Sequence, residues 1–179
     1  GKTVIADTYD EVLEYCKSTE PLTIVISGTI DMGSSRHQRI RDNKTLVGAY
    51  SNQIIDCNFR TNNEYGTEGD EPSDNIVLRN INFLAKNNKG NILFNVWSSR
   101  QIWVDHCTFD SQLSYDRTGN GQDEVGKFIW INTPYESYMD KKDLDRSPDY
   151  VTLSYNIFKN RYWTVAYGTQ NGEITRDRT

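Results

Sequence analysis

The segment Trp103-Val-Asp-His-Cys-Thr-Phe109 alternates apolar and polar residues and closes on a phenylalanine. The same rhythm returns in three further segments: Gln53-Ile-Ile-Asp-Cys-Asn-Phe59, Val77-Leu-Arg-Asn-Ile-Asn-Phe83 and Val151-Thr-Leu-Ser-Tyr-Asn-Ile-Phe158. The closing phenylalanines are 24, 26 and 49 residues apart. We interpret the last gap as two periods of about 25 residues, with Phe128-Ile-Trp-Ile131 as the strand of the intervening coil.

Each of these segments predicts a short strand that ends in a polar turn. Such a narrow strand cannot bury its inner face alone, but successive coils stacked at about 4.8 Å can bury it together. The repeat therefore predicts an all-β solenoid, a parallel β-helix formed by a single domain over residues 1–179. The alternative is another all-β solenoid, or a sandwich in which the strands resemble each other by accident.

An amphipathic helix is predicted ahead of the repeats. Thr8-Tyr-Asp-Glu11 has the pattern of a capping box, and the apolar side of the following turns carries Val12, Leu13, Tyr15 and Cys16. We expect this helix to close the open end of the coil stack. The first strands are predicted at 23–27 and 29–30, and a strand followed by a turn at 44–48.

The three cysteines predict buried thiols. Their odd number excludes a full disulfide framework, and Cys16, Cys57 and Cys107 match no C-x-x-C metal pattern. In the repeat, Cys57, Ile81 and Cys107 each stand two residues before the closing phenylalanine. Two coils would separate Cys57 from Cys107 by roughly 9.6 Å, which is too far for a disulfide.

Composition and charge narrow the classes of function. Hydrophobic residues make up 36% of the chain and the mean hydropathy is −0.73, which is a poor fit to a helical bundle. A net charge of −5 argues against a general nucleic-acid or membrane-surface partner, and no run of eighteen apolar residues could span a membrane. An anionic ligand would need locally placed Arg and Lys. Polar stretches at 111–126 and 134–148 predict long loops on one side of the stack, where solenoids commonly bind.

The segment Ile102-Trp-Val-Asp-His-Cys-Thr-Phe109 resembles the W-x-D-H signature strand of the pectate lyase and pectin lyase family. Residues 74–83 are similar to the family strand one coil earlier, residues 151–158 to the strand two coils later, and residues 20–30 to its opening strand. The resemblance covers nearly the whole chain. It implies a right-handed parallel β-helix with an N-terminal capping helix, a secreted location, and cleavage of pectin-like uronate polymers by β-elimination.

The resemblance also implies where the chemistry lies. In β-elimination, calcium, Arg and Lys neutralise the uronate carboxylate, and a base then removes the acidified C5 proton. In the family this base is an arginine in a coil that would follow Thr179, so no catalytic residue is assigned in this chain. Arg176 and Arg178 are not assigned as the base. The chain end lacks an amphipathic cap, so we expect an incomplete β-helix that a second polypeptide completes.

The calcium ligands of the family match this sequence poorly. The expected positions carry Asn91 or Ile92, and then Gly126 and Trp130. Asp123 and Glu124 are the nearby acids that could hold a metal, so calcium dependence is expected to be weaker than in typical pectate lyases. Pectin lyases, which lack calcium, line their cleft with aromatic and basic residues, and Lys127, Trp130 and Trp163 suit that arrangement.

Two further residues are predicted to bind substrate. Arg161 stands at a family His position and could bind a carboxylate in a bidentate manner, and Trp163 stands at the family's substrate-binding Lys position. The predicted substrate-binding set is therefore Arg161, Trp163, Lys127 and Trp130.

Other polar residues are given structural roles. Asp105 and His106 are expected to be hydrogen-bonded scaffold residues beside the cleft. Arg36, Arg39 and Arg41 are interpreted as solvated surface, whereas Lys141 and Lys142 have a better claim to touch an anionic ligand. Trp97, Trp103 and Trp130 are left open between core and cleft.

Two hypotheses of function remain. The first is a secreted polysaccharide lyase to which this chain contributes part of the cleft. The second is a non-catalytic β-helix that binds glycans. Unsaturated uronate products, which absorb ultraviolet light, would distinguish them.

Overall fold

The computed structural model describes residues 1–33, 37–61, 72–86, 92–111, 127–132, 148–160 and 164–168. In chain order the elements are β1 (Lys2–Ala6), α1 (Tyr9–Lys17), β2 (Leu22–Asp31), β3 (Gln38–Arg39), β4 (Lys44–Ile55), β5 (Phe59–Arg60), β6 (Ile76–Arg79), β7 (Asn82–Ala85), β8 (Phe94–Trp97), β9 (Arg100–Asp105), β10 (Thr108–Ser111), β11 (Ile129–Asn132), β12 (Asp149–Ser154), β13 (Ile157–Phe158) and β14 (Val165–Tyr167). The all-β prediction with one N-terminal helix is confirmed.

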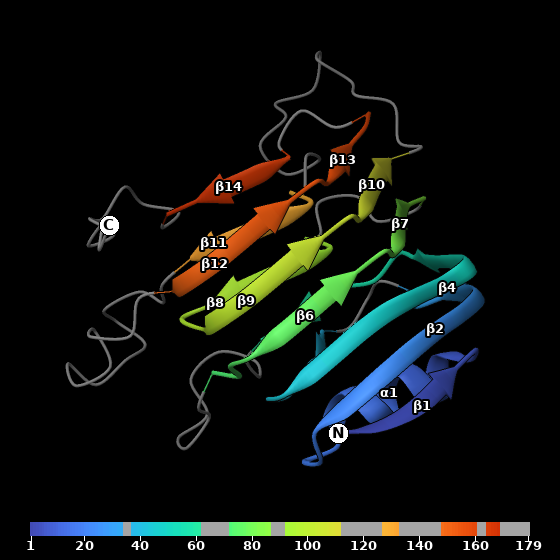
Figure 1. The fold of residues 1–179 in the computed structure, drawn as a ribbon. Helices are drawn as coiled ribbons and strands as arrows, with labels where there is room; N and C mark the ends of the chain where they lie inside the picture. The colour runs from blue at the N-terminus through green and yellow to red at the C-terminus, as the bar shows by residue number, and fades with distance from the viewer. Residues whose placement is uncertain are drawn as a thin grey trace.

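The strands form three parallel ladders, which are the faces of a β-helix (Figure 1). Ladder 1 contains β1, β2, β4, β6, β9 and β12. Ladder 2 contains the later parts of β2 and β4, followed by β7, β10 and β13. Ladder 3 contains β3, β5, β8, β11 and β14. The parallel β-helix predicted from the repeat is therefore confirmed.

The predicted capping box begins helix α1. The Thr8 hydroxyl accepts a bond from the Glu11 amide at 3.4 Å, and the Glu11 carboxylate accepts the Thr8 amide at 3.2 Å. Val12 and Cys16 on the inner side are fully buried in the core. The helix packs against β1, β2 and β3 at the N-terminal end of the stack (Figure 1). The expected helical closure of this end is confirmed.

Equivalent inward residues stack along each ladder to make the core. In ladder 1 this row is Ile24, Leu46, Leu78, Val104 and Leu153. In ladder 2, the Phe109 ring stacks on Phe83 at 4.8 Å and on Phe158 at 5.3 Å between centroids. These ring distances are close to the spacing of neighbouring parallel strands. The stacking of the core rings is therefore consistent with the register of the strands.

One predicted repeat position is wrong. Phe59 lies in ladder 3 and pairs with Phe94, whereas Phe83 pairs with Ile54 of ladder 2. An alternating strand that ends in Phe suits any of the three faces, so sequence rhythm alone could not assign the face. Cys107 and Ile81 do occupy equivalent positions, because their following residues Thr108 and Asn82 are paired, but Cys57 belongs to another ladder.

The predicted extra coil between Phe109 and Phe158 is also wrong. These residues pair directly, and so do Ile102 and Val151, so 151–158 follows 102–109 by one coil. The strand at 129–132 is β11 of ladder 3 within that same coil. Insertions at turns leave strand pairing intact, so coil length varies without breaking the ladders. The predicted loops at 111–126 and 134–148 lie almost wholly outside the described residues.

Buried polar groups hold the N-terminal coils together. Cys16, Cys57 and Cys107 are buried thiols as predicted, and burial raises the pKa of Cys16 to about 12. Lys44 is buried too, and its ammonium donates to the carbonyls of Glu20 at 2.8 Å and Asp42 at 2.9 Å. Burial lowers the pKa of this lysine. General rules of residue burial would have placed Lys44 at the surface.

The predicted turn at 44–48 is absent, because β4 continues through Gly48 to Ile55 and crosses from ladder 1 to ladder 2. A side chain at Gly48 would collide with the Asn80 carbonyl and the Asn52 amide. The Asn52 amide donates to Asn80 O at 3.0 Å and Asn80 donates to Gly48 O at 3.0 Å. Glycine thus permits this corner to close. Among the described residues, no helix is long and apolar enough to cross a membrane.

Candidate functional site

A row of outward side chains crosses ladder 3. Phe59, Phe94 and Ile129 point into the core at one register position, so the next residue of each strand points outward. These outward positions are paired in the order Arg39, Arg60, Asn95, Trp130 and Ala166. We call this set the ladder 3 row.

Two guanidinium groups begin the ladder 3 row. Arg39 and Arg60 are register partners, which places two positive charges on adjacent strands. Arg39 donates from Nε to the Ser73 hydroxyl at 3.4 Å, and the Arg60 guanidinium contacts His37 Nε2. Arginine pairs of this kind suit a carboxylate, which they bind through paired N–H donors.

An aromatic platform and a lysine lie further along the same row. The Lys127 ammonium is 4.6 Å from the Trp130 ring centroid, within the range of a cation–π contact. The Trp130 indole donates to the Gly168 carbonyl at 3.0 Å, which fixes the plane of the ring. Partial burial lowers the pKa of Lys127. The structure therefore brings together these two predicted substrate-binding residues.

Asn95 separates the arginines from Trp130 in the row. It is 1% exposed, and its amide oxygen has no hydrogen-bond partner among the described residues. A buried amide oxygen without a donor is uncommon in native proteins. Its acceptor position is unused and lies beneath the surface between Arg60 and Trp130.

The remaining predicted residues divide into two groups. Arg161, Trp163, Asp123 and Glu124 lie outside the described residues, as do Arg36, Lys141 and Lys142. Arg39 is half-buried in the ladder 3 row, so its interpretation as solvated surface is wrong. Arg60 was not anticipated, although it directly follows an inward phenylalanine and alternation alone requires it to face outward.

The described positions do not fit the calcium site of the family. Trp130 occupies one expected ligand position, and its side chain carries no oxygen that could bind this hard cation. Another expected position falls on Asn91 or Ile92, and of these Ile92 carries no oxygen either. In the part of the chain that the structure describes, no three His, Cys, Asp or Glu residues lie close enough to hold a metal. Asn91, Gly126, Asp123 and Glu124 lie outside that part.

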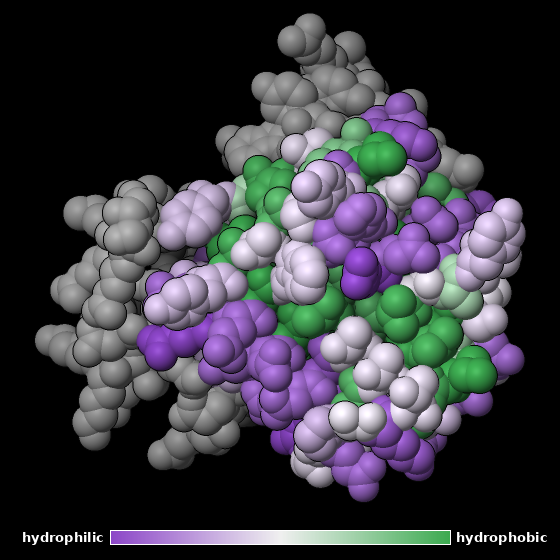
Figure 2. Space-filling model, viewed as in Figure 1, coloured by the Kyte–Doolittle hydropathy of each residue, from purple (hydrophilic) through white to green (hydrophobic). Residues whose placement is uncertain are grey.

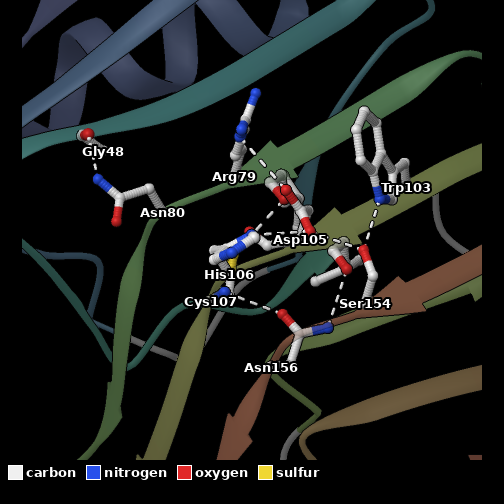
Figure 3. Close-up of polar contacts among 11 residues, drawn as sticks. Gly48, Arg79, Asn80, Trp103, Asp105, His106, Cys107, Ser154 and Asn156 are labelled. Atoms are coloured by element: carbon white, nitrogen blue, oxygen red, sulfur yellow. Dashed lines mark hydrogen bonds and ion pairs between the residues drawn. The ribbon is translucent and has the colours of Figure 1, made fainter.

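A second polar cluster surrounds Asp105 at the end of β9 in ladder 1 (Figure 3). One carboxylate oxygen accepts from the Ser154 hydroxyl at 2.6 Å and from His106 Nδ1 at 2.9 Å. The other oxygen is 3.3 Å from Arg79 Nε. The Ser154 bond, followed by the interactions with His106 and Arg79, lowers the pKa of Asp105.

The backbone of the β-helix corner explains this convergence. His106 has φ of 51°, and the residues at the same corner of the neighbouring coils, Asn80 and Tyr155, have φ of 54° and 52°. The turn ends ladder 1 and begins ladder 2. Asn156 supports it by accepting the Cys107 amide at 2.9 Å and donating to Val104 O at 2.8 Å. The side chains before and at the turn are thus held next to Asp105.

The hydrogen bonds limit what this cluster can do. Ser154 and His106 both bind the same oxygen of Asp105, and no bond joins the serine to the histidine. A hydroxyl nucleophile requires a neighbouring base to take its proton, so the cluster is no hydrolytic triad. Asp105 instead orients its neighbours. It lies in ladder 1, whereas Lys127 and Trp130 lie in ladder 3, so the structure does not bring the two groups together.

Comparison with known proteins agrees with the fold. The family model described as pectate lyase matches residues 1–178. A pectate lyase of Emericella nidulans is 23% identical over 163 residues, which cover 91% of this chain and 41% of that protein. A pectate lyase of Bacillus subtilis is 23% identical over 198 residues, covering 92% and 42%. A pectate trisaccharide-lyase of Thermotoga maritima is 28% identical over 117 residues, covering 61% and 29%.

A solved structure shares the architecture. The pectate lyase of Bacillus sp. N165, crystallised with trigalacturonate, superposes with a TM-score of 0.56 at 18% identity, covering 89% of this chain and 57% of that one. The chain therefore spans less than half the length of these curated relatives. In each relative the matched region is part of one longer polypeptide, which gives no support to the predicted second polypeptide. With a family match that extends over residues 1–178, this chain belongs to the pectate lyase family.

Proposed function

We propose that this chain is part of a secreted polysaccharide lyase that cleaves uronate polymers by β-elimination. The observation that carries the proposal is the ladder 3 row, where Arg39 and Arg60 are register partners and Lys127 lies beside Trp130, on a chain of net charge −5. Membership of the pectate lyase family supports the reaction class. The trigalacturonate bound by the Bacillus sp. N165 enzyme supports an acidic sugar as substrate.

The chemistry of the row suits this reaction. Removal of the C5 proton of a uronate leaves negative charge that spreads onto the adjacent carboxylate. Guanidinium and ammonium groups that already surround that carboxylate stabilise the developing charge. Arg39 and Arg60 would bind it through paired donors, and Trp130 would stack on a sugar ring.

Other parts of the proposal concern residues that the structure does not describe. Arg161 is proposed as a further carboxylate ligand and Trp163 as a further stacking platform. The catalytic base is proposed to be an arginine outside residues 1–179, so the groups described here bind, orient and neutralise the substrate. No step of this scheme passes through calcium.

The test is the ultraviolet absorbance of unsaturated uronate products formed from polygalacturonate. Lys127→Gln should lower kcat/KM by about tenfold, because a charge-assisted contact contributes roughly 1.5 kcal/mol at the lower end of its range. That lower end applies because Lys127 is only half-buried. Lys159→Gln is the matched control, since Lys159 is an exposed lysine that follows β13 of ladder 2. Arg39→Gln should act in the same direction as Lys127→Gln.

Each outcome of this test has a clear meaning. Product formation that falls in the Lys127 and Arg39 variants but not in the Lys159 variant supports the assignment. Equal activity in all variants means that ladder 3 does not bind the substrate. In a protein that also carries the proposed base, binding of polygalacturonate without any product would contradict the lyase and favour the alternative, a glycan-binding β-helix.

A further inference from the structure

We infer that ladder 1 carries a second binding surface for acidic sugar units, separate from the ladder 3 row. We call it the Arg79 patch, and it consists of Arg79, Trp103, His106 and Tyr155 around the buried Asp105 (Figure 3). The inference goes beyond the proposed function, because it concerns binding on another face and no catalytic step.

The Arg79 patch presents aromatic surface to solvent. Trp103 is 41% exposed and Tyr155 is 80% exposed, although both are large side chains. The indole N–H of Trp103 donates to the Ser154 hydroxyl at 2.8 Å, which fixes the orientation of the ring. The His106 and Tyr155 rings lie 4.9 Å apart with an angle of 30° between their planes. Fixed, exposed rings are the surfaces on which the apolar faces of sugars stack.

The cation of the patch is held in position but remains accessible. Arg79 uses its Nε to contact Asp105, and its side chain is 55% exposed. Figure 3 shows the end of the guanidinium directed away from Asp105. The guanidinium carbon is 6.0 Å from the Trp103 ring centroid, at the outer limit of a cation–π contact. The terminal N–H donors can therefore bind a carboxylate beside the aromatic ring.

A single buried group orients all of these exposed side chains. The Asp105 side chain is only 3% exposed, and it accepts bonds from Arg79, His106 and Ser154. Ser154 in turn holds Trp103. Burial of a carboxylate is unfavourable unless several donors compensate it. Here the donors are the same residues that form the rim of the patch.

The neighbouring coils show that coil stacking does not require this arrangement. At the register position of Trp103 the adjacent strands carry Val77 and Thr152, and β4 carries Thr45. At the position of Asp105, β4 carries Val47 two coils away. Small β-branched residues are sufficient to form this face of the ladder. Trp103 and Asp105 therefore serve something other than strand pairing.

The surface around the patch suits an extended ligand. Ile5, Val25, Val47 and Arg79 are register partners along one outward row, and Ile5 is 63% exposed. Figure 2 shows hydrophobic and weakly polar residues running across this face between hydrophilic margins. The structure thus offers a flat, uncharged track that leads to an arginine and aromatic rings. A carboxylated polysaccharide has the matching chemistry, with apolar ring faces and one negative charge on each unit.

The experiment titrates the protein with trigalacturonate and with its fully methyl-esterified form, and follows NMR signals. The indole N–H of Trp103 should shift with trigalacturonate, and at least tenfold more ester should be needed for the same shift. Arg79→Gln should weaken that shift about tenfold. Trp103→Val introduces the residue type found at Val77 in the preceding coil and removes the indole signal itself. In this variant the Tyr155 ring signals should no longer shift when trigalacturonate is added. Tyr150→Thr is the control, because Tyr150 is exposed in the same strand as Ser154 but at its other end.

Lys127→Gln separates this inference from the proposed function. A Trp103 shift that persists in Lys127→Gln supports an independent site on ladder 1, whether or not lyase activity is lost. The inference is overturned if trigalacturonate leaves the Trp103 indole unperturbed, if Arg79→Gln binds as the parent does, or if Lys127→Gln abolishes the Trp103 response. It is also overturned if the ester binds as tightly as the acid, since charge recognition by Arg79 would then be absent. Melting curves of Arg79→Gln and Trp103→Val verify that the variants are folded.

Discussion

Replacement of Phe109 by leucine tests the coil register of the fold. Phe109 is fully buried between Phe83 and Phe158, with centroid distances of 4.8 and 5.3 Å and interplanar angles of 13° and 15°. Leucine keeps most of the apolar burial but loses both of these stacked pairs, as well as the tilted contact with Phe128 at 5.9 Å. Each aromatic pair contributes about 0.5–1.5 kcal/mol beyond area burial, so the free energy of unfolding should fall by about 1–3 kcal/mol.

A double-mutant cycle measures the coupling between Phe109 and Phe158, the pair that the sequence spacing wrongly placed two coils apart. The single and double leucine variants of Phe109 and Phe158 are unfolded in guanidinium chloride and followed by tryptophan fluorescence. Because these rings stack directly, their coupling energy should be about 0.5–1.5 kcal/mol. The control pair is Ile24→Val and Phe158→Leu, which lie four coils apart at roughly 19 Å and should be additive to within about 0.5 kcal/mol.

The result that would refute this reasoning is specific. Additive effects for Phe109 and Phe158, together with normal coupling of Phe83 and Phe109, would mean that another coil separates Phe109 from Phe158. That arrangement is the one that equal spacing of about 25 residues implies. Coupling in both adjacent pairs requires the direct register in which 49 residues form one coil.

Three further predictions concern the helix cap, calcium and the thiols. Thr8→Ala should lower the free energy of unfolding by about 0.5–2 kcal/mol in denaturant melts, through loss of the N-cap bond. The bonds from Asp7 and Thr8 lower the pKa of Glu11, so its stabilisation is present above the unfolded pKa near 4.3 and is lost as pH falls through the lower folded value. Glu11→Gln should therefore reduce the loss of stability on acidification. A melting temperature that falls with decreasing pH as steeply in Glu11→Gln as in the parent would contradict this. EDTA should reduce lyase activity only partly, because Ile92 and Trp130 supply no calcium ligand; complete loss that calcium alone restores would show that Asp123 and Glu124, or other residues, form a site. The thiols of Cys16 and Cys107, with pKa values raised by burial to about 12 and 11, should resist alkylation at pH 8 until the protein unfolds, as mass spectrometry would reveal.

Local pattern was sufficient to predict the helix and several of the strands, but not β1, β3 or β8. The capping box at Thr8 and Glu11 depends on residues three apart, and inward alternation depends on residues two apart, so both are visible in the sequence. The face that each strand occupies depends on pairing with a distant coil. Phe59 therefore resembled Phe83 in sequence although Phe94 is its actual partner. Strand rhythm carries no information about turn length, which explains the extra coil predicted after Phe109.

In the candidate sites, too, contacts between residues close in sequence were predictable, whereas contacts between coils were not. Lys127 and Trp130 are three residues apart, and their contact follows from local sequence. Arg39 and Arg60 become neighbours only through the register of β3 and β5, which sequence analysis did not place. The cluster around Asp105 likewise joins residues 26 positions earlier and 49 positions later, at Arg79 and Ser154. Those separations equal one coil each, so correct register would have revealed them.

The division of chemistry between faces follows from the geometry of the β-helix. Alternation commits every second strand residue to the core, so ligand-binding groups must lie at outward positions, and each ladder presents its own outward row. The ladder 3 row and the Arg79 patch are built from different strands, and the core of the coils separates them. Substitutions that share no partner act additively. For a polymer that engages both faces at once, the two contacts contribute jointly to one affinity, so the free-energy losses of Lys127→Gln and Arg79→Gln should add in the double variant. A short oligomer occupies one face at a time, so each face should respond only to its own substitution. A double variant that binds long polymers as the weaker single variant does would mean that no single chain engages both faces.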